Sequence, residues 1–558
     1  MAGEREPALG RPLLRAAGDA ATHSVSAVPA PDLEQFAFTD EGPWVVEPAQ
    51  LAWKRGLGVV RARTRGEVPG LLARRRMPPL GRLARVLGAL AVALGGWWLR
   101  ERGTERSRRG VSRRLRRAFE DLGSTYVKLG QIVSAFEGLF PDELVTEFKR
   151  LRDQVPPEHF EDIRAVVEAD LGRRLEDVFS EFAREPLAAA SIAQVHAARL
   201  VTGEEVVVKV QRQRVAALVH ADVRALAWLS PVLVGRIPVA ALANPPALVE
   251  LFAQQIVEEL DFRLEAENML DLAHVFADTG QRTMVVPRPH PELVTHRVLV
   301  MERLRGFAFD DVESMKAAGI DTSALLRSGL IAALEGAMLY GVFHGDLHGG
   351  NLFVQPDGRT VLLDFGITGR LDEPQRLAFL RLLVTGTSGD VVGQLAALRD
   401  LGAFPLDTDL DAVVHDLGLD GPVKDPTRMS ADELVAELSD LTKQLLGYGA
   451  RAPKELMLFV KNMMFLNAAT ATLAPDIDIL GEIANIYMYF TEHHGDRIVR
   501  DIGFDPDRAA LDLDAVKAGF GLSADIDQLT FRELQERRQI ILRRMQERPR
   551  GRRRPHTS

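Results

Sequence analysis

The alternation of apolar and polar residues between positions 187 and 302 predicts a strand-rich region. The runs VHAARL and EEVVVKV flank Thr202-Gly203, and together they predict a β-hairpin. Further strands are predicted at MVVP (284–287) and RVLVME (297–302). One long helical run, from Pro245 to about 276 with Asn244 as its cap, interrupts these strands.

Helical periodicity prevails on either side of this region. Most segments from 321 to about 500 show this helical periodicity. One of them, SALLRSGLIAALEGAMLYG, ends at Gly341, which is suited to a C-cap. Two amphipathic helical segments are predicted earlier, at 119–140 and 141–154. Residues 1–50 are rich in Ala, Pro and acids without periodicity, so we predict that they are mostly disordered.

Composition and charge narrow the class of protein. The chain has 558 residues, of which 46% are hydrophobic and 26% charged, as is ordinary for a soluble globular protein. It has no cysteine, which excludes disulfides, cysteine-ligated zinc and thiol catalysis and fits a reducing compartment. The N-terminus lacks the apolar core of a secretory signal, so we expect a cytoplasmic protein.

The net charge of −9 conceals a basic segment at 51–118, where positions 51–117 hold 19 Lys and Arg against three acids. Within it, 86–99 is an apolar run of fourteen residues, reaching about 21 Å against about 30 Å for a hydrocarbon core. Flanking arginines and Trp97-Trp98 favour an interfacial helix, peripheral at the inner face of the plasma membrane, over a membrane span. A buried helix in an Arg-rich linker is the alternative. Nucleic acid is not expected, because aromatic interleaving and a binding motif are lacking.

The stretch HGDLHGGN at 344–351, followed by LLDFG at 362–366, carries the clearest chemistry. In phosphoryl-transfer loops an Asp meets the proton of the nucleophile, and an Asn five residues later holds a metal. Asp346 and Asn351 have that spacing, and Asp364 supplies the Asp of D-F-G. A hairpin turning at 356–358 would bring Asn351 and Asp364 together as oxygen ligands for Mg²⁺. His344 and His348 are read as bracing the loop rather than as metal ligands, since neighbouring glycines argue against a helix.

Lys209, in the apolar strand VVVKV, is the candidate cation for the phosphates of a nucleotide. Its acidic partner is expected from the helical run 245–276, which contains EELDFRLEAEN. Glu259 and Glu265 would point about 120° apart on an unbroken helix, so they are not expected to serve the same cation. A region that is strand-rich, followed by a helical one with this loop just past the border, is the order of a two-lobed kinase. The 455–473 run is read as a core helix that Lys461 and Asn462 interrupt.

A Gly-rich loop is missing between the first strands. Its place is taken by PLAAASIAQVHAARL, with Ala188, Ala189, Ala190 and Ser191 as candidate nucleotide-binding residues. Alanine does not take the positive φ angles open to glycine, so the backbone there should be more constrained. Glu302, at the end of the predicted strand 297–302, is a further candidate for nucleotide binding.

The chain contains six motifs: KLGQ (128–131), AAASIAQVH (188–196), VVVKVQR (206–212), ELDFRLEAEN (259–268), HGDLHGGN and LLDFG. They occur in the order found in the UbiB/AarF (ADCK-like) family, which the chain resembles over roughly 115–480. The resemblance implies an α+β, two-lobed protein-kinase-like fold with a helical K-x-G-Q extension covering the active site. Expected units are 1–50, 51–118, the extension at 119–186, the N-lobe at 187–303, the C-lobe at 304–500 and a helical, basic tail at 501–558.

The resemblance also assigns roles. Lys209 matches the lysine that contacts the nucleotide, Glu265 its helix partner and Asp346 the catalytic Asp, while Asn351 and Asp364 match the metal ligands. Lys128 and Gln131 match the K-x-G-Q motif, and Glu259 and Asp261 match the E-x-D motif that engages it. Glu259 would then face Lys128 while Glu265 faces Lys209. The chain departs from the family at Leu347 and Gly349, which replace two prolines, and at Ala193, where glycine is common.

Three functions are compatible with these motifs. The first is an atypical kinase or ATPase that uses ATP (or ADP) and Mg²⁺ in quinone or isoprenoid-lipid metabolism, with an anionic membrane surface, such a lipid or quinone-biosynthesis proteins as partners. The second is a nucleotide-gated scaffold without turnover. The third is an antibiotic-type phosphotransferase, against which Lys128 and Gln131 count because that class typically lacks the extension.

Overall fold

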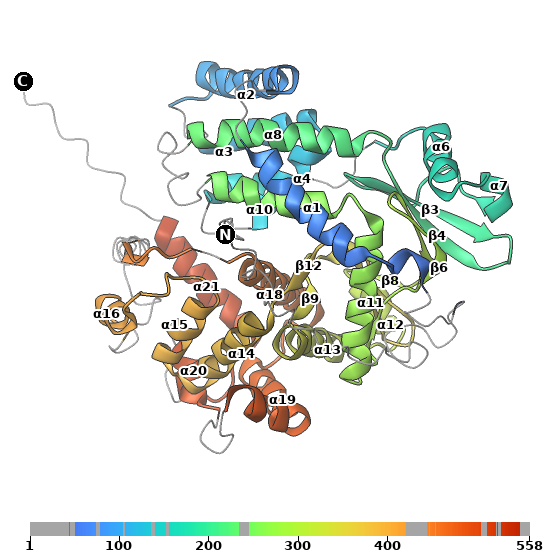
Figure 1. Cartoon of the computed structure of the whole chain (residues 1–558). Coiled ribbons are helices and arrows are strands. Elements are labelled where there is room, and N and C mark those ends of the chain that lie inside the picture. The colour runs from blue at the N-terminus through green and yellow to red at the C-terminus, as the bar shows by residue number, and fades with distance from the viewer. Residues whose placement is uncertain are drawn as a thin grey trace, which may run out of the picture.

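The computed structural model describes residue 44 and residues 51–73, 79–103, 107–135, 140–151, 156–233, 245–419, 444–445, 447–451, 453–503, 511–519, 522 and 526–546. The predicted disorder of 1–50 therefore lies outside the described residues except at Trp44, and so does the end of the basic tail. Figure 1 shows a strand-rich region at one side of the molecule and a helical region at the other, as the sequence pattern predicts.

The strand-rich region is built on a six-stranded sheet in the order β1-β3-β4-β7-β6, with β2 also paired to β3. The predicted hairpin is confirmed: β3 and β4 pair antiparallel, and Gly203 turns between them with φ 108°. Alternate valines of β4, Val206, Val208 and Val210, are fully buried, which accounts for the apolar alternation of the strand. The strands are β1 (Phe179–Phe182), β2 (Ala188–Ala189), β3 (Ala193–Leu200), β4 (Glu205–Gln211), β6 (Pro289–Val294) and β7 (Val298–Glu302).

The predicted helical run 245–276 is two helices and not one. α10 (Pro245–Glu258) ends just before Glu259, and α11 (Phe262–Asp278) begins after Asp261, whose side chain accepts a hydrogen bond from the Arg263 amide at 3.1 Å. This N-cap satisfies a free N–H of the first turn and fixes the break. A further helix, α8 (Val215–Leu233), packs against α10 and was not predicted.

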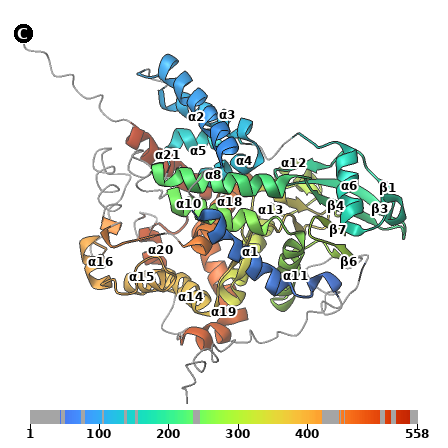
Figure 2. The same ribbon diagram turned by 45° about the horizontal axis from the view of Figure 1, so that its top comes forward.

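Helices from the N-terminal part cover α8 and α10. Figures 1 and 2 show α2 as the outermost of them, lying along α3. Arg82 of α2 reaches the fully buried Asp222 of α8 with two hydrogen bonds and also donates to the Leu122 carbonyl at 2.6 Å, so part of the basic segment belongs to the fold. The helices that precede β1 in the chain are η2 (Ala52–Lys54), α1 (Leu57–Leu72), α2 (Leu80–Arg100), α3 (Ser107–Leu122), α4 (Ser124–Ala135), α5 (Asp142–Phe148), α6 (Phe160–Leu171) and α7 (Leu175–Val178). Of these, η2, α6 and α7 pack against the six-stranded sheet.

The apolar helix near the N-terminus is longer than predicted. The apolar run at 86–99 is part of the 21-residue helix α2, which rises about 31 Å and is not too short for a bilayer core. Among the described helices, three are long and apolar enough to cross a membrane by length and composition: Leu80–Arg100, Val215–Val232 and Lys454–Leu473. α2 is mostly exposed, whereas the other two are much more buried.

The helical region holds the predicted catalytic hairpin. β10 and β11 pair antiparallel around Gly358 (φ 87°), in a sheet of order β5-β11-β10-β8, and β9 pairs with β12. Its elements are β5 (Met284–Val285), β8 (Phe307–Ala308), α12 (Val312–Ala317), α13 (Thr322–Glu335), the π-helix η3 (Gly336–Tyr340), β9 (Val342–His344), η4 (Gly349–Asn351), β10 (Leu352–Val354), β11 (Thr360–Leu362), β12 (Thr368–Arg370), α14 (Glu373–Ser388), α15 (Val391–Asp400), α16 (Leu410–Asp416), α18 (Lys454–Leu473), α19 (Ile479–Ile502), α20 (Leu513–Gly519) and α21 (Phe531–Gln546). Gly341 caps the π-turn that follows α13, as predicted.

Candidate functional site

The β10–β11 hairpin brings the two predicted metal ligands to one place. The Leu363 amide donates to the Asn351 carbonyl at 2.8 Å, so Asp364 follows directly from a residue bonded to Asn351. The Asn351 side-chain amide donates to the Asp346 carbonyl at 3.1 Å, which ties the metal-ligand position to the catalytic loop. Among the described residues other than glycine, Asp364 alone has a positive φ, 54°. Strain of this kind persists where the surroundings enforce it, and it is concentrated at functional sites.

Lys209 of β4 reaches the same place from the six-stranded sheet. Its ammonium group lies 2.7 Å from Glu265 of α11 and 3.1 Å from Asp364, and 5.5 Å from the ring centroid of Phe262. The contact predicted between Lys209 and Glu265 is therefore confirmed. Burial acts to lower the Lys209 pKa, but Asp364 and Glu265 outweigh it and raise that pKa above its ordinary value. The lysine is thus charged and fixed between two carboxylates.

His344 and His348 brace the catalytic loop, as predicted. His344 is buried, and its ring bonds the Asp364 carbonyl at 2.9 Å and the Asp346 amide at 3.1 Å. Burial lowers the His344 pKa, so the ring is held neutral and fit for these two bonds. His348 accepts from the Gly350 amide at 3.2 Å. No cluster of three or more His, Asp or Glu side chains suited to a metal occurs in the part of the chain that the structure describes.

The extension covers the site through Lys128 of α4, which lies 3.0 Å from Glu259. Burial raises the pKa of the Glu259 carboxyl to about 7; Lys128 acts to lower this pKa, and the nearby Asp364 carboxylate acts to raise it. The Gln131 side chain lines the same groove as Lys128, so both residues of the motif face the site from one side of α4. The expectation for Asp261 was wrong: its side chain caps α11 and pairs with Arg263 at 2.6 Å, while Glu259 makes the contact to the extension.

The Ala-rich segment begins as a short strand and not as an open loop. β2 pairs with β3, and the Ala190 amide donates to the Ala193 carbonyl at 2.8 Å, so Ala188 and Ala189 lie in the sheet. Ser191 is buried, and the Arg212 guanidinium donates a hydrogen bond to the Ala190 carbonyl at 3.0 Å. Glu302, at the end of β7, is buried and accepts from the Arg288 amide at 3.3 Å. Nucleotide binding by these residues stays a prediction.

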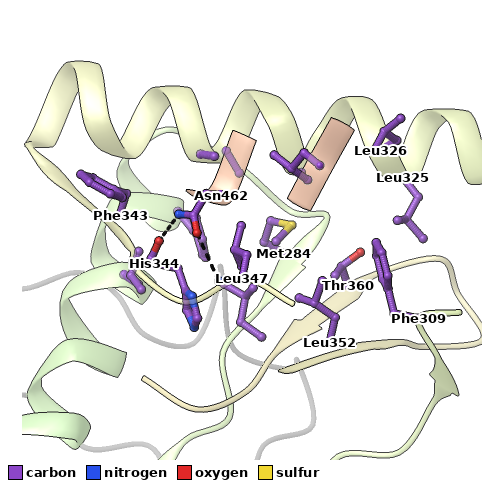
Figure 3. A pocket seen from close by; sticks show the side chains of 17 residues that line it. Met284, Phe309, Leu325, Leu326, Phe343, His344, Leu347, Leu352, Thr360 and Asn462 are labelled. Carbon is purple, nitrogen blue, oxygen red and sulfur yellow. Dashed lines mark hydrogen bonds between the residues drawn. The ribbon is translucent and has the colours of Figure 1, made fainter. Parts of the chain in front are cut away.

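Two residues of α18 at the site were missed by the sequence argument, which read them as interruptions of a core helix. The Lys461 ammonium group hydrogen-bonds one oxygen of Asp346. Asn462 is buried, accepts from the Leu347 amide at 3.2 Å and donates to the His344 carbonyl, as Figure 3 shows. Beneath these bonds lies a small apolar cavity of about 40 Å³. Two adjacent polar residues inside an apolar run were the available signal, since such groups are costly unless they are satisfied.

A groove of about 1520 Å³ opens beside Asp346. Its wall is apolar, with Met457, Val460, Met463 and Met464 of α18 and Leu382 and Leu383 of α14. Cationic side chains surround this wall: Lys128, Lys149, Lys454, Lys461, Arg532 and Arg538. An apolar surface that is bordered by cations and reaches a partly buried carboxylate suits an amphiphilic ligand with an anionic part.

The residues present fit a magnesium nucleotide. Asp364 offers a carboxylate, and Asn351 offers the oxygen of its side-chain amide. The NH₂ group of the same amide donates to the Asp346 carbonyl. Mg²⁺ takes hard oxygen ligands of this kind together with phosphates and water. Burial raises the Asp364 pKa, but Lys209 and Lys128 outweigh it and hold that pKa well below its ordinary value, so this carboxyl group is ionised. When bound, the ion would neutralise charge on the phosphate oxygens.

This combination of a strand-rich lobe, a helical lobe, a lysine–glutamate pair and a loop carrying Asp and Asn defines a kinase-like protein. Residues 150–395 match the ABC1 atypical kinase-like domain. An uncharacterized protein of Mycobacterium tuberculosis is 32% identical over 492 residues, which cover 82% of this chain and 96% of that protein. The probable protein kinase UbiB of Pseudomonas paraeruginosa is 32% identical and covers 77% and 79%.

An uncharacterized aarF domain-containing protein kinase of Arabidopsis thaliana is 31% identical and covers 72% of this chain and 81% of that one. The chain therefore belongs to the UbiB/AarF family, as its motifs predicted. A solved structure of Rv3197 with erythromycin, from M. tuberculosis, covers 62% of this chain and 91% of that one, at 21% identity. Its TM-score of 0.36 is too low to support an argument about function.

Proposed function

We propose that this protein binds ATP with Mg²⁺ and transfers the γ-phosphoryl group to an amphiphilic acceptor of quinone or isoprenoid-lipid metabolism, or hydrolyses it, at a membrane surface. The observation that carries the proposal is the position of Asp346. This carboxylate lies between the metal-ligand hairpin and the apolar groove. Family membership and the Lys209–Glu265 pair support the nucleotide part.

The residues of the chain have separable tasks in this reaction. Lys209, fixed by Glu265, would hold the phosphates, and Asp346 would orient the hydroxyl of the acceptor. Burial raises the Asp346 pKa, but Lys461, Lys128 and His348 outweigh it and lower that pKa below its ordinary value. A carboxylate so acidic is suited to orienting a nucleophile more than to removing its proton early.

The membrane part of the proposal is supported by α2. This helix exposes Leu80, Leu87, Val92, Leu94, Trp98 and Leu99, each with at least 44% of its surface accessible. Arg100 and Arg102 follow the apolar face, where they would meet anionic headgroups. We propose that α2 lies in the interface of an anionic membrane.

The test is Mg²⁺-dependent ATP turnover by the purified full chain, with and without vesicles of anionic lipid, beside Asp346→Asn. Turnover that lipid stimulates and that the variant loses would support the proposal. The second candidate is a nucleotide-gated scaffold, which the Lys128–Glu259 pair favours because it holds the extension over the site. Tight nucleotide binding without turnover in either condition would favour the scaffold.

A further inference from the structure

Lys461 of α18 differs from Lys209 and Lys128 in its partners. Lys209 is engaged by Glu265 and Asp364, and Lys128 lies 3.0 Å from Glu259. Within the described residues, the ion-pair partner of Lys461 is Asp346 alone, the predicted catalytic carboxylate. Its side chain is 27% exposed, against 11% for Lys209, and it lines the groove. Lys461 is thus a cation that an incoming molecule can reach.

Bracing of the loop does not require Lys461, because Asn462 already does this. Asn462 is buried and bonds the loop on both sides of Asp346, at the His344 carbonyl and the Leu347 amide. A charged side chain that remains partly open to the groove adds no comparable constraint. Lysine also has a flexible stem of four carbons, so its ammonium group can leave a resting partner for an arriving anion.

The chemistry at Asp346 calls for a cation at this place. During phosphoryl transfer the acceptor oxygen forms a bond to the γ-phosphorus, the bond from that phosphorus to the bridging oxygen breaks, and ADP leaves with the electron pair. The hydroxyl proton passes by way of Asp346 to solvent. Negative charge meanwhile spreads over three oxygens of the transferring group, and a cation at this place lowers the barrier.

We propose that Lys461 is a catalytic residue that binds the transferring phosphoryl group from the acceptor side, with Asp346 as its resting partner. This inference rests on the proposed function. Lys209 holds the nucleotide in the ground state, whereas Lys461 meets the phosphoryl group as it moves toward the acceptor. A division of this kind makes the contribution of Lys461 specific to the transition state.

The experiment compares Lys461→Ala and Lys461→Arg with the original chain and with Arg451→Ala. Arg451 is an exposed cation just before α18 that does not line the groove. For each protein we would measure the affinity for Mg-ADP, the gain in that affinity when aluminium fluoride is added, the melting temperature, kcat and KM. Aluminium fluoride with ADP imitates the transferring phosphoryl group, with water in the place of the acceptor.

We expect Lys461→Ala to leave the affinity for Mg-ADP within about two-fold of the original. The gain in affinity on adding aluminium fluoride should be smaller in this variant by a factor on the order of 100. The kcat should fall with little change in the KM for ATP, Lys461→Arg should recover part of both losses, and Arg451→Ala should match the original chain. A gain kept in full by Lys461→Ala would overturn the inference while leaving the proposed function intact.

Two other results are also decisive. If the original chain binds Mg-ADP but shows no gain with aluminium fluoride, the proposed transfer function fails, and Lys461 has no phosphoryl group to bind. The other result is that Lys461→Ala melts at a lower temperature and binds Mg-ADP and Mg-ADP with aluminium fluoride more weakly by the same factor. In that case Lys461 braces the loop. That result overturns the inference.

Discussion

The two sides of this site, at which we propose that the nucleotide and the acceptor bind, are built in different ways. On the nucleotide side, Glu265 is buried and pairs with Lys209, whose side chain is only 11% exposed, and Asp364 has a strained backbone. On the acceptor side, Lys461 is partly open and borders a wide apolar groove. The first arrangement suits one constant ligand held in one geometry, and the second admits a ligand whose apolar part varies. Changes on the two sides should therefore separate nucleotide binding from use of the acceptor.

The largest effect is expected on the nucleotide side, from Asp364→Asn. The substitution removes the charge of the proposed metal ligand but keeps its shape, and Asn tolerates the positive φ of this position well. We expect the affinity for the nucleotide in the presence of Mg²⁺ to fall at least about 100-fold, or ~2.7 kcal/mol. Titration calorimetry with and without Mg²⁺ measures this loss.

Asp357→Asn is the matched control, because Asp357 lies at the exposed turn of the same hairpin and pairs with Arg359. Its affinity should equal that of the original chain. An unchanged affinity in Asp364→Asn itself would show that Asp364 is not a metal ligand, and the nucleotide side would lose its defining feature.

The second effect is structural and belongs to the acceptor side, through Asn462→Leu. Leu is of similar size but leaves the Leu347 amide and the His344 carbonyl without their partner. Each such buried group costs about 1–3 kcal/mol, so the loss of both partners should lower the free energy of unfolding by at least about 2 kcal/mol. Urea unfolding measures it, with Asn467→Leu as control, since Asn467 is on the same helix and bonds Arg538 near the surface. Equal losses in both variants would contradict the bracing role.

The two sides of the site also differ in how much of each the sequence alone could predict. Asp346, Asn351 and Asp364 lie within 19 positions of one another and are joined by a hairpin with a clear turn, so local patterns were sufficient to place them. Lys209 was identified because a charged residue in an apolar strand needs a partner, whereas Glu265 was assigned as that partner only through the resemblance to the family. Lys461 is 115 residues from Asp346, and only the packing of α18 brings them together. No local pattern encodes that contact.

The errors in the fold prediction have similar causes. The break between α10 and α11 contains neither Gly nor Pro, and its signal was the N-cap Asp261 alone. α2 was judged too short because Arg82 and Arg85 were taken as its flank, whereas the helix continues through them to Leu80. Arg82 is tolerated there because Asp222, 140 positions later, neutralises it. Tertiary partners of this kind override a reading based on neighbouring residues.

A third prediction tests whether the groove receives the apolar part of the acceptor. Ala468 is exposed on α18 and lines the groove, and Ala468→Phe would fill part of it. We expect the KM for a lipid acceptor to rise about ten-fold, ~1.4 kcal/mol, with Mg-ADP affinity unchanged. Thr472→Phe is the control, because Thr472 is also a small, exposed residue of the same helix but does not line the groove. A fall in nucleotide affinity without an effect on the acceptor would reverse the assignment of the two sides.

The smallest effect is expected at α2, which would bring the acceptor side to its membrane. Deleting the N-terminal segment is unsuitable as a test, because Arg82 would no longer neutralise the buried Asp222. Leu99→Ser avoids this, since Leu99 is 74% exposed. Losing one apolar side chain from the interface should weaken binding to anionic vesicles about five-fold, ~1 kcal/mol. The control Leu406→Ser changes an equally exposed leucine, 80% accessible, on another part of the molecule. If sedimentation with vesicles shows the same binding for both variants and the original chain, α2 does not contact the membrane, and the groove must receive its acceptor from solution.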